Sequence, residues 1–435
     1  MRKILIMATL VVFVFSLQAQ TIRDEIQDNL RCSASNYMAY PNPVQHKLTP
    51  APKGKKPFYI SHYGRHGSRY HNRARTYDIP YQMLAKADSL GKLTPLGRSV
   101  LARLAVIRQD AYQHWGELTA LGASQHRDIM RRMVERFPEI FEGKVEVDAR
   151  STTVPRCILS MENAMLQLAK MVPQANIHHN ATQRDMYYLN QQDRYLFSLK
   201  MDSATQVAYN AFAQHHEHNK RLINSLFNDT AYSNKIDGGE LNYFLFKIAS
   251  NIQSTEISKS ITLYDLFTDD EVYANWRKEN AWWYVAFGGC TINGGLQPYT
   301  QRNLLRRIIQ QADSCLRLDH PGVQLRYGHD TVVLPLVCLL DINGYGLATD
   351  NLESLDRRRW ANYKISPMAA NLQLVFYREG PDDQDVLLKV LLNENEATLP
   401  LKSAEGCYYH WSDFRDYYLA KLDAFDKQEI GKQKK

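Results

Sequence analysis

The chain has 435 residues, of which 44% are hydrophobic and 23% are charged. This composition is typical of a globular protein with a large buried core and excludes fibrous and intrinsically disordered classes. The formal net charge of +7 is only mildly basic, and it falls by two to +5 if Arg2 and Lys3 are removed. We therefore expect small anionic partners rather than nucleic acid, for which no binding motif is present.

The first residues are typical of a secretory signal peptide. Arg2 and Lys3 precede an apolar run over residues 4–17, and small or polar residues follow. The run is shorter than the about 20 residues that a membrane-spanning helix needs. We predict a signal peptide over residues 1–19 with cleavage after Ala19, an exported protein that is periplasmic or secreted, and no stable membrane insertion after cleavage.

The cysteines are even in number, and export would permit disulfides. Their spacing does not give a connectivity, and Cys338 lies in an apolar stretch where it could equally be a buried free thiol. The six cysteines are Cys32, Cys157, Cys290, Cys315, Cys338 and Cys407.

Three short segments have the β-branched, aromatic or alternating pattern of strands, and each ends on charged residues. Residues 58–63 lead into Gly64-Arg65-His66-Gly67, residues 144–148 lead into Ala149-Arg150, and residues 323–327 lead into Gly328-His329-Asp330. Between them, residues 155–171 carry an apolar stripe of helical period, with Thr152 or Thr153 as the expected N-cap. Strands that alternate with helices predict an α/β fold, with an open and mostly parallel sheet flanked by helices.

The strand pattern fades between about residues 185 and 286, where long helical stretches take over. It returns at residues 372–377 and 386–392, which predict a hairpin at one edge of the sheet. We therefore predict an α/β catalytic domain over residues 20–180 and 291–435, and an inserted, mainly helical domain over residues 181–290 that shapes substrate specificity.

Charged groups just past the ends of neighbouring strands can converge on one crevice of an open α/β sheet. The converging set predicted here is Arg65, His66, Arg69, Arg150, His329 and Asp330. Hydrolysis of a phosphate monoester needs cations on the non-bridging oxygens, a nucleophile, and an acid for the leaving oxygen. Arginine forks suit the first task, a neutral histidine the second, and a carboxyl group the third. This set therefore predicts small-molecule phosphate esters as ligands.

The run from Arg65 to Arg69 resembles the Arg-His-Gly-x-Arg-x-Pro signature of the histidine acid phosphatases, with His71 at the proline position. Four further stretches resemble that family in the same order, and they are residues 116–125, 148–152, 328–331 and 366–372. The resemblance implies a phosphoglycerate mutase-like fold. It implies His66 as the nucleophile, Asp330 as the proton donor, and Arg65, Arg69, Arg150 and His329 as phosphate ligands. No metal and no cofactor is expected.

Within the family, the length and the helical insert are most similar to bacterial multiple inositol polyphosphate phosphatases and phytases. That subgroup typically carries His-Ala-Glu where this chain has His329-Asp330. The resemblance implies phytate-like inositol polyphosphates or a broad range of phosphate esters as substrates. Two alternatives remain open, a phosphoryl mutase that uses the same phosphohistidine and a phosphate-ester binding protein without turnover.

Three other stretches could each have either a chemical role or a purely structural one. His215 and His218 have metal-ligand spacing, although a solvated polar face is the simpler interpretation. Residues 288–295 are glycine-rich and fit a domain junction better than a phosphate loop. The cluster Trp282-Trp283-Tyr284 fits the core of the helical domain better than a sugar-stacking surface.

Overall fold

The structure, a computed structural model, describes residues 20–190 and 193–433, so the predicted signal peptide lies outside the described residues. Its centre is a mixed sheet in the order β10-β8-β7-β1-β5-β2-β3, with β9 paired to β8. Strands β1, β5, β2 and β3 are parallel, whereas β7 runs antiparallel to β1 and β8 antiparallel to β7. The strands are β1 (Lys56–Arg65), β2 (Glu146–Ser151), β3 (Asn176–Asn180), β5 (Gly322–Gly328), β7 (Asn371–Arg378), β8 (Leu387–Leu392), β9 (Asn395–Glu396) and β10 (Tyr408–His410).

Strand β1 is the central strand, and its residues are buried from Pro57 onward. A strand covered on both faces needs apolar side chains on both, so its sequence does not alternate. Tyr59 and Tyr63 pack into the hydrophobic core on one face of the sheet, and Ile60 packs into the core on the other face. This burial fixes the end of β1, and with it the position of the residues that follow.

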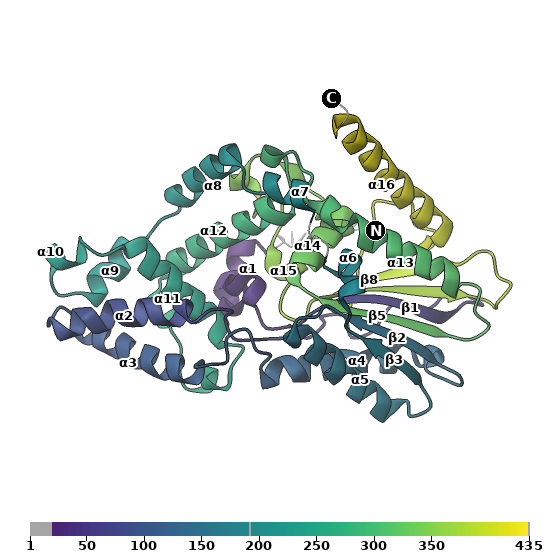
Figure 1. Ribbon diagram of the computed structural model, residues 1–435, viewed down its shortest axis with the longest axis horizontal. Coiled ribbons are helices and arrows are strands. Elements are labelled where there is room, and N and C mark those ends of the chain that lie inside the picture. The colour runs from purple at the N-terminus through teal and green to yellow at the C-terminus, as the bar shows by residue number, and fades with distance from the viewer. Residues whose placement is uncertain (1–19, 191–192, 434–435) are drawn as a thin grey trace, which may run out of the picture.

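Helices cover both faces of the sheet, as Figure 1 shows. Helices α4 (Ala120–Arg136) and α5 (Pro155–Met171) supply the core on one face, and α13 (Arg302–Cys315), α14 (Asp330–Leu339) and α16 (Trp411–Gln433) lie on the other. The predicted α/β fold, with an open and mostly parallel sheet, is confirmed. The 372–377 and 386–392 hairpin is also confirmed as β7 and β8, although the short β10 lies outside β8 at the edge.

The helical part of the molecule draws on more of the chain than residues 181–290. Helices α2 (Arg75–Ser89) and α3 (Pro95–Asp110) share one hydrophobic core with α9 (Lys220–Leu226) and α11 (Gly238–Ile252). Residues 20–180 are therefore not wholly part of the α/β layer, because the apolar faces of α2 and α3 are buried against helices from the insert. The predicted boundary missed this because periodicity shows that a helix is amphipathic, not which element covers its apolar face.

One long helix has contacts on both sides of the molecule. Helix α12 (Asp269–Phe287) joins them, since Trp276 packs with the N-terminal segment while Trp283 and Tyr284 join the core above the sheet. The other elements are α1 (Ile22–Asp28), the 3-10 helix η1 (Leu30–Tyr37), α6 (Met186–Leu189), α7 (Arg194–Leu199), α8 (Ser203–His215), α10 (Thr230–Ser233), β4 (Gly289–Cys290), β6 (Ala348–Thr349) and α15 (Asn362–Ile365).

The structure also tests the predictions for the N-cap of α5, the cysteines and membrane spans. Helix α5 has the predicted bounds, but its N-cap is Val154, which makes no side-chain cap, so Thr152 and Thr153 were wrong. All six cysteines carry free thiols, and five of them, including Cys338, are buried, so the permitted disulfides are not formed in the described structure. Among the described residues, no helix is both long and apolar enough to cross a membrane.

Candidate active site

His66 is the first residue after β1, and the backbone on both sides of it is fixed. Its N–H donates to Gly328 O at 2.9 Å, and its carbonyl accepts from Ala369 N at 3.0 Å. The imidazole is 1% exposed, with Nδ1 2.9 Å from Gly67 O. A carbonyl can only accept, so Nδ1 carries the proton and Nε2 keeps its lone pair.

The loop after His66 is locked against the start of α4. A Cβ on Gly67 would lie 2.3 Å from Gly122 O, and one on Gly122 would lie 2.2 Å from Ser68 O, so both positions need glycine for the backbones to approach. Ser68 O also accepts from Thr119 N at 2.9 Å, and Ser68 N donates to Gln125 Oε1 at 2.9 Å. The two sequence motifs at residues 65–69 and 116–125 are therefore one structural unit.

Arg65 and Asp330 form a buried ion pair beside His66. Arg65 Nη2 lies 2.8 Å from Asp330 Oδ2, and Arg65 Nη1 donates to Ser366 O at 2.8 Å and to Asn36 O. Asn36 Nδ2 in turn donates to Asp330 Oδ2 at 2.8 Å. Asn36, which sequence patterns did not mark, thus contacts both the cation and the carboxylate from the N-terminal 3-10 helix η1.

Arg69 belongs to the loop after His66 and is 4% exposed. Its guanidinium carbon is 5.3 Å from the centre of the Tyr37 ring, and its Nη1 donates to Tyr70 O at 2.9 Å. His71, at the proline position of the family signature, is buried against the same tyrosine ring at 4.8 Å. The His71 N–H donates to Tyr77 OH at 3.0 Å, a bond that proline could not make.

His329 completes the cluster from the end of β5. Its ring centre is 5.8 Å from that of His66, and its Nε2 is 3.3 Å from Thr152 Oγ1. Cys157 Sγ lies 3.8 Å from the same ring and donates to Gly328 O at 3.2 Å. The structure therefore brings together five of the six predicted residues, namely Arg65, His66, Arg69, His329 and Asp330.

Arg150 is not brought to this cluster. Its Nη2 pairs with Asp148 at 2.7 Å, its Nη1 lies 3.9 Å from Asp185, and its side chain is 30% exposed. Residues 148 and 150 share one face of β2, because alternate side chains of a strand point to the same side. Arg150 was predicted as a phosphate ligand because it lies at the end of a strand. Its position along β2 places the side chain on the face of Asp148, away from the cluster.

Arg156, in the first turn of α5, occupies the position that Arg150 was expected to fill. Its positive charge is among the causes that lower the pKa values of both His66 and His329. The next turn of the same helix contacts the loop after His66, since Gly67 N donates to Ser160 Oγ at 3.1 Å. A usable sequence signal existed, because Arg156 follows Pro155 at a helix N-terminus, where backbone N–H groups favour anions.

The three arginines retain donors for an anion. The Nε atoms of Arg65, Arg69 and Arg156 are buried and have no hydrogen-bond partner among the described residues. Buried donors without partners are costly, so these arginines indicate a ligand that accepts several hydrogen bonds. A tetrahedral anion with non-bridging oxygens fits this need.

The arginines also set the protonation states. Burial, and then the charges of Arg65, Arg69 and Arg156, hold the pKa of His66 well below its usual value, so the imidazole stays neutral in acid. Burial and Arg156 lower the pKa of His329 to about 4. Burial raises the pKa of Asp330, but Arg65, Arg69 and the Asn36 hydrogen bond outweigh burial and lower it to about 2.

A cleft of about 560 Å³ opens over this cluster. Asp330 and Arg69 lie in its wall. The rest of the wall comes from η1, the loop after β1, the helical part and the start of α14. It consists of Asn36, Tyr37, Asn72, Tyr209, Tyr243, Lys247, Glu279, Trp282, Trp283 and Thr331. The tryptophan pair therefore does more than fill the core, because both rings also line the cleft.

The other predicted groups lie elsewhere. His215 and His216 gather with Glu353 rather than with His218, and their ligand atoms lie within 4.8 Å of one another. Arg277 also donates to Glu353 at 2.7 Å, so a cation already pairs with this carboxylate. In the glycine-rich stretch at residues 288–295, β4 pairs with β6 as a small second sheet.

A buried histidine among three arginines at one edge of an α/β sheet is an arrangement suited to a phosphoryl group. The chain matches the histidine phosphatase superfamily (branch 2) over residues 64–393 and belongs to that family. Asn36 and Tyr37 lie before the matched region.

The relatives are inositol phosphate enzymes. The chain is 34% identical over 106 residues to multiple inositol polyphosphate phosphatase 1 of Drosophila melanogaster, a match that covers 24% of this chain and 22% of that protein. Among solved structures, the fold is similar to Bifidobacterium longum multiple inositol polyphosphate phosphatase in complex with phosphate (TM-score 0.75, 15% identity, 90% of this chain and 98% of that chain). It is also similar to the D. castellii phytase (TM-score 0.63, 14% identity, 90% and 85%).

Proposed function

We propose that this protein is an exported phosphomonoesterase that works through a phosphohistidine on His66, with Asp330 as the proton donor. The observation that carries the proposal is the buried imidazole, whose Nδ1 is tied to Gly67 O and whose Nε2 keeps its lone pair among three arginine side chains. Arg65, Arg69 and Arg156, with His329, hold the phosphate. Arg156 replaces Arg150 in this set because it lies on the cluster and Arg150 does not.

In the first step, Nε2 of His66 attacks phosphorus and the bond from phosphorus to the ester oxygen breaks. The leaving oxygen takes the proton of Asp330. In the second step, water attacks the phosphohistidine, its proton passes to the Asp330 carboxylate, and the bond from phosphorus to Nε2 breaks. The arginines stay charged throughout and stabilise the negative charge on the non-bridging oxygens.

The low pKa of Asp330 in the free site raises the question of where the proton for the leaving oxygen comes from. Arg65 and Arg69 favour the carboxylate, so the acid has lost its proton before substrate binds. A phosphate monoester that binds as a monoanion brings one proton, and its negative charge offsets the field of the arginines at Asp330. The complex then holds one proton shared between phosphate and carboxylate, which is the state that the first step requires. Activity on the acid side of neutrality follows.

Inositol phosphates are the leading substrate class. The family relatives include multiple inositol polyphosphate phosphatases and a phytase, and the cleft over the site is large enough for a leaving group of ring size. The export part of the proposal rests on the signal-peptide pattern of residues 1–19.

Phosphate release tests the proposal. Protein purified without residues 1–19 is assayed on an aryl phosphate, inositol phosphates of increasing phosphorylation, sugar phosphates and nucleotides. We expect hydrolysis of the aryl ester and of inositol phosphates, and loss of both with His66→Ala. Tight binding without release, or transfer only to a phosphorylated acceptor, would contradict the proposal.

A further inference from the structure

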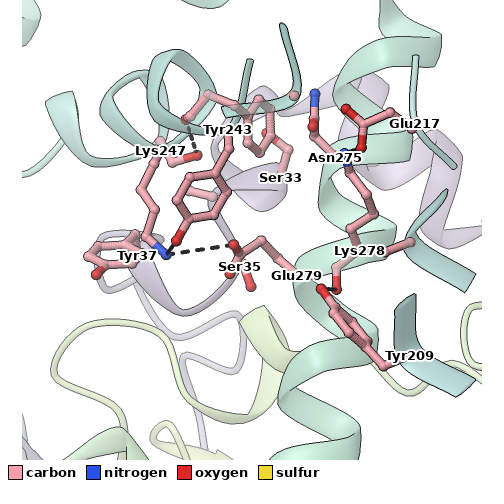
Figure 2. Close-up of a pocket in the computed structure, with 15 residues that line it drawn as sticks. Ser33, Ser35, Tyr37, Tyr209, Glu217, Tyr243, Lys247, Asn275, Lys278 and Glu279 are labelled. Atoms are coloured by element: carbon pink, nitrogen blue, oxygen red, sulfur yellow. Dashed lines mark hydrogen bonds and ion pairs between the residues drawn. The ribbon is translucent and has the colours of Figure 1, made fainter. Parts of the chain in front are cut away.

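Beyond the cleft lies a second, inner pocket of about 200 Å³ between η1, α8, α11 and α12, drawn in Figure 2. Five residues line both the cleft and the pocket, so the two spaces adjoin through a shared wall. They are Tyr37, Tyr209, Tyr243, Lys247 and Glu279. The inner pocket therefore lies next to the cleft, on the side of η1 and the helical part.

The charges of the inner pocket are balanced in pairs. Lys247 Nζ lies 3.6 Å from Glu279 Oε1, and Lys278 Nζ lies 3.4 Å from Glu217 Oε2. Lys247 also donates to Tyr243 OH at 2.9 Å. Figure 2 shows Lys247 beside the rings of Tyr37 and Tyr243 and Lys278 close to Glu217, with each lysine beside its own acid. Neither lysine is left as an uncompensated cation.

This balance contrasts with the arginine end of the cleft. There, Arg65, Arg69 and Arg156 face the single carboxylate Asp330, and buried donors remain without partners among the described residues. The phosphate that reacts therefore meets a surplus of positive charge. A second phosphate in the inner pocket would meet two lysines that are already paired with Glu217 and Glu279. The ionised oxygens of these acids can only accept and therefore repel an anion.

Hydroxyl groups suit the inner pocket better than phosphates. A hydroxyl both donates and accepts, so it can donate to Glu217 or Glu279 and accept from Lys278. The rings of Tyr37, Tyr209 and Tyr243 provide amphipathic walls for the C–H faces of a saturated ring.

We propose that the inner pocket binds the unphosphorylated, hydroxyl-rich part of the leaving group. The enzyme then selects polyhydroxylated ring alcohols that carry few phosphates over fully phosphorylated rings. This inference rests on the proposed phosphomonoesterase activity and narrows its substrate class. Glu217 and Glu279 are the residues that discriminate against additional phosphates.

The inference is tested by comparing the kcat/KM values for three substrates, which are an aryl phosphate, inositol monophosphate and inositol hexakisphosphate. We expect the wild type to favour the monophosphate over the hexakisphosphate by at least about ten-fold. Glu217→Gln and Glu279→Gln keep the side-chain shape and remove a negative charge. Each should raise the ratio of hexakisphosphate to monophosphate turnover by roughly five-fold, mainly through a lower KM for the hexakisphosphate.

Glu256→Gln is the matched control, because Glu256 is exposed and lies outside both spaces. It should leave all three values unchanged. A wild type that prefers the hexakisphosphate, or glutamine variants whose ratio equals that of the control, would overturn this inference while aryl phosphate hydrolysis leaves the proposed function intact. Absence of aryl phosphate hydrolysis would overturn the proposed function and this inference together.

Discussion

Comparison of Arg150→Ala with Arg156→Ala tests which arginine binds the phosphate. The sequence pattern favours Arg150 and the structure favours Arg156. Arg156 acts electrostatically on His66 and His329, and its Nε has no partner among the described residues, whereas Arg150 is paired with Asp148. A charge-assisted hydrogen bond contributes about 1.5–3 kcal/mol. Loss of one such bond to the transition state should lower kcat/KM roughly 10- to 100-fold.

The assay is steady-state hydrolysis of an aryl phosphate, with thermal unfolding to show that both variants are folded. Arg156→Ala should show the roughly 10- to 100-fold lower kcat/KM. Arg156→Lys should recover part of this loss, since a lysine keeps the charge but not the planar fork. Arg150→Ala should stay close to the wild type because its guanidinium lies outside the cluster. An Arg150→Ala loss equal to or larger than that of Arg156→Ala would refute this assignment.

Three further changes test other parts of the site. Asn36→Ala removes a hydrogen bond that favours the Asp330 carboxylate, so the pKa of Asp330 should rise. The basic limb of the pH profile of kcat should then move up by about one pH unit. A basic limb that does not move would show that Asn36 is only structural. Asp330→Asn should impair alkyl phosphates far more than activated aryl phosphates, and equal losses would argue against its acid role. Gly67→Ala would place a Cβ 2.3 Å from Gly122 O and should lower the free energy of unfolding by about 1–3 kcal/mol, which chemical denaturation measures; wild-type stability would contradict the close backbone contact.

The sequence was most informative where one local pattern determines one element. The strand into Arg65 and the helix at residues 155–171 follow from residue type and period, and the structure has both. The motifs at residues 65–69 and 328–331 were found because strand ends in an α/β sheet meet at one edge. Five of the six predicted site residues lie together for this reason.

Two of the misses share a physical cause, which is dependence on contacts between distant segments. Asn36 contacts Asp330 across 294 positions of the chain, and nothing in its neighbours predicts that contact. The packing of α2 and α3 against α9 and α11 is equally non-local. Arg150 failed for a local reason, since the alternation of β2 places its side chain with Asp148 rather than with His66.

The most direct test of the mechanism is to trap the phosphorylated protein. Radiolabelled phosphate ester is mixed with the enzyme, turnover is stopped with alkali, and the labelled peptide is mapped. A phosphohistidine is stable in alkali and labile in acid, so the label should be found on His66, should leave in acid, and should be absent in His66→Ala. Label on any other residue, or steady-state turnover by His66→Ala, would contradict His66 as the nucleophile.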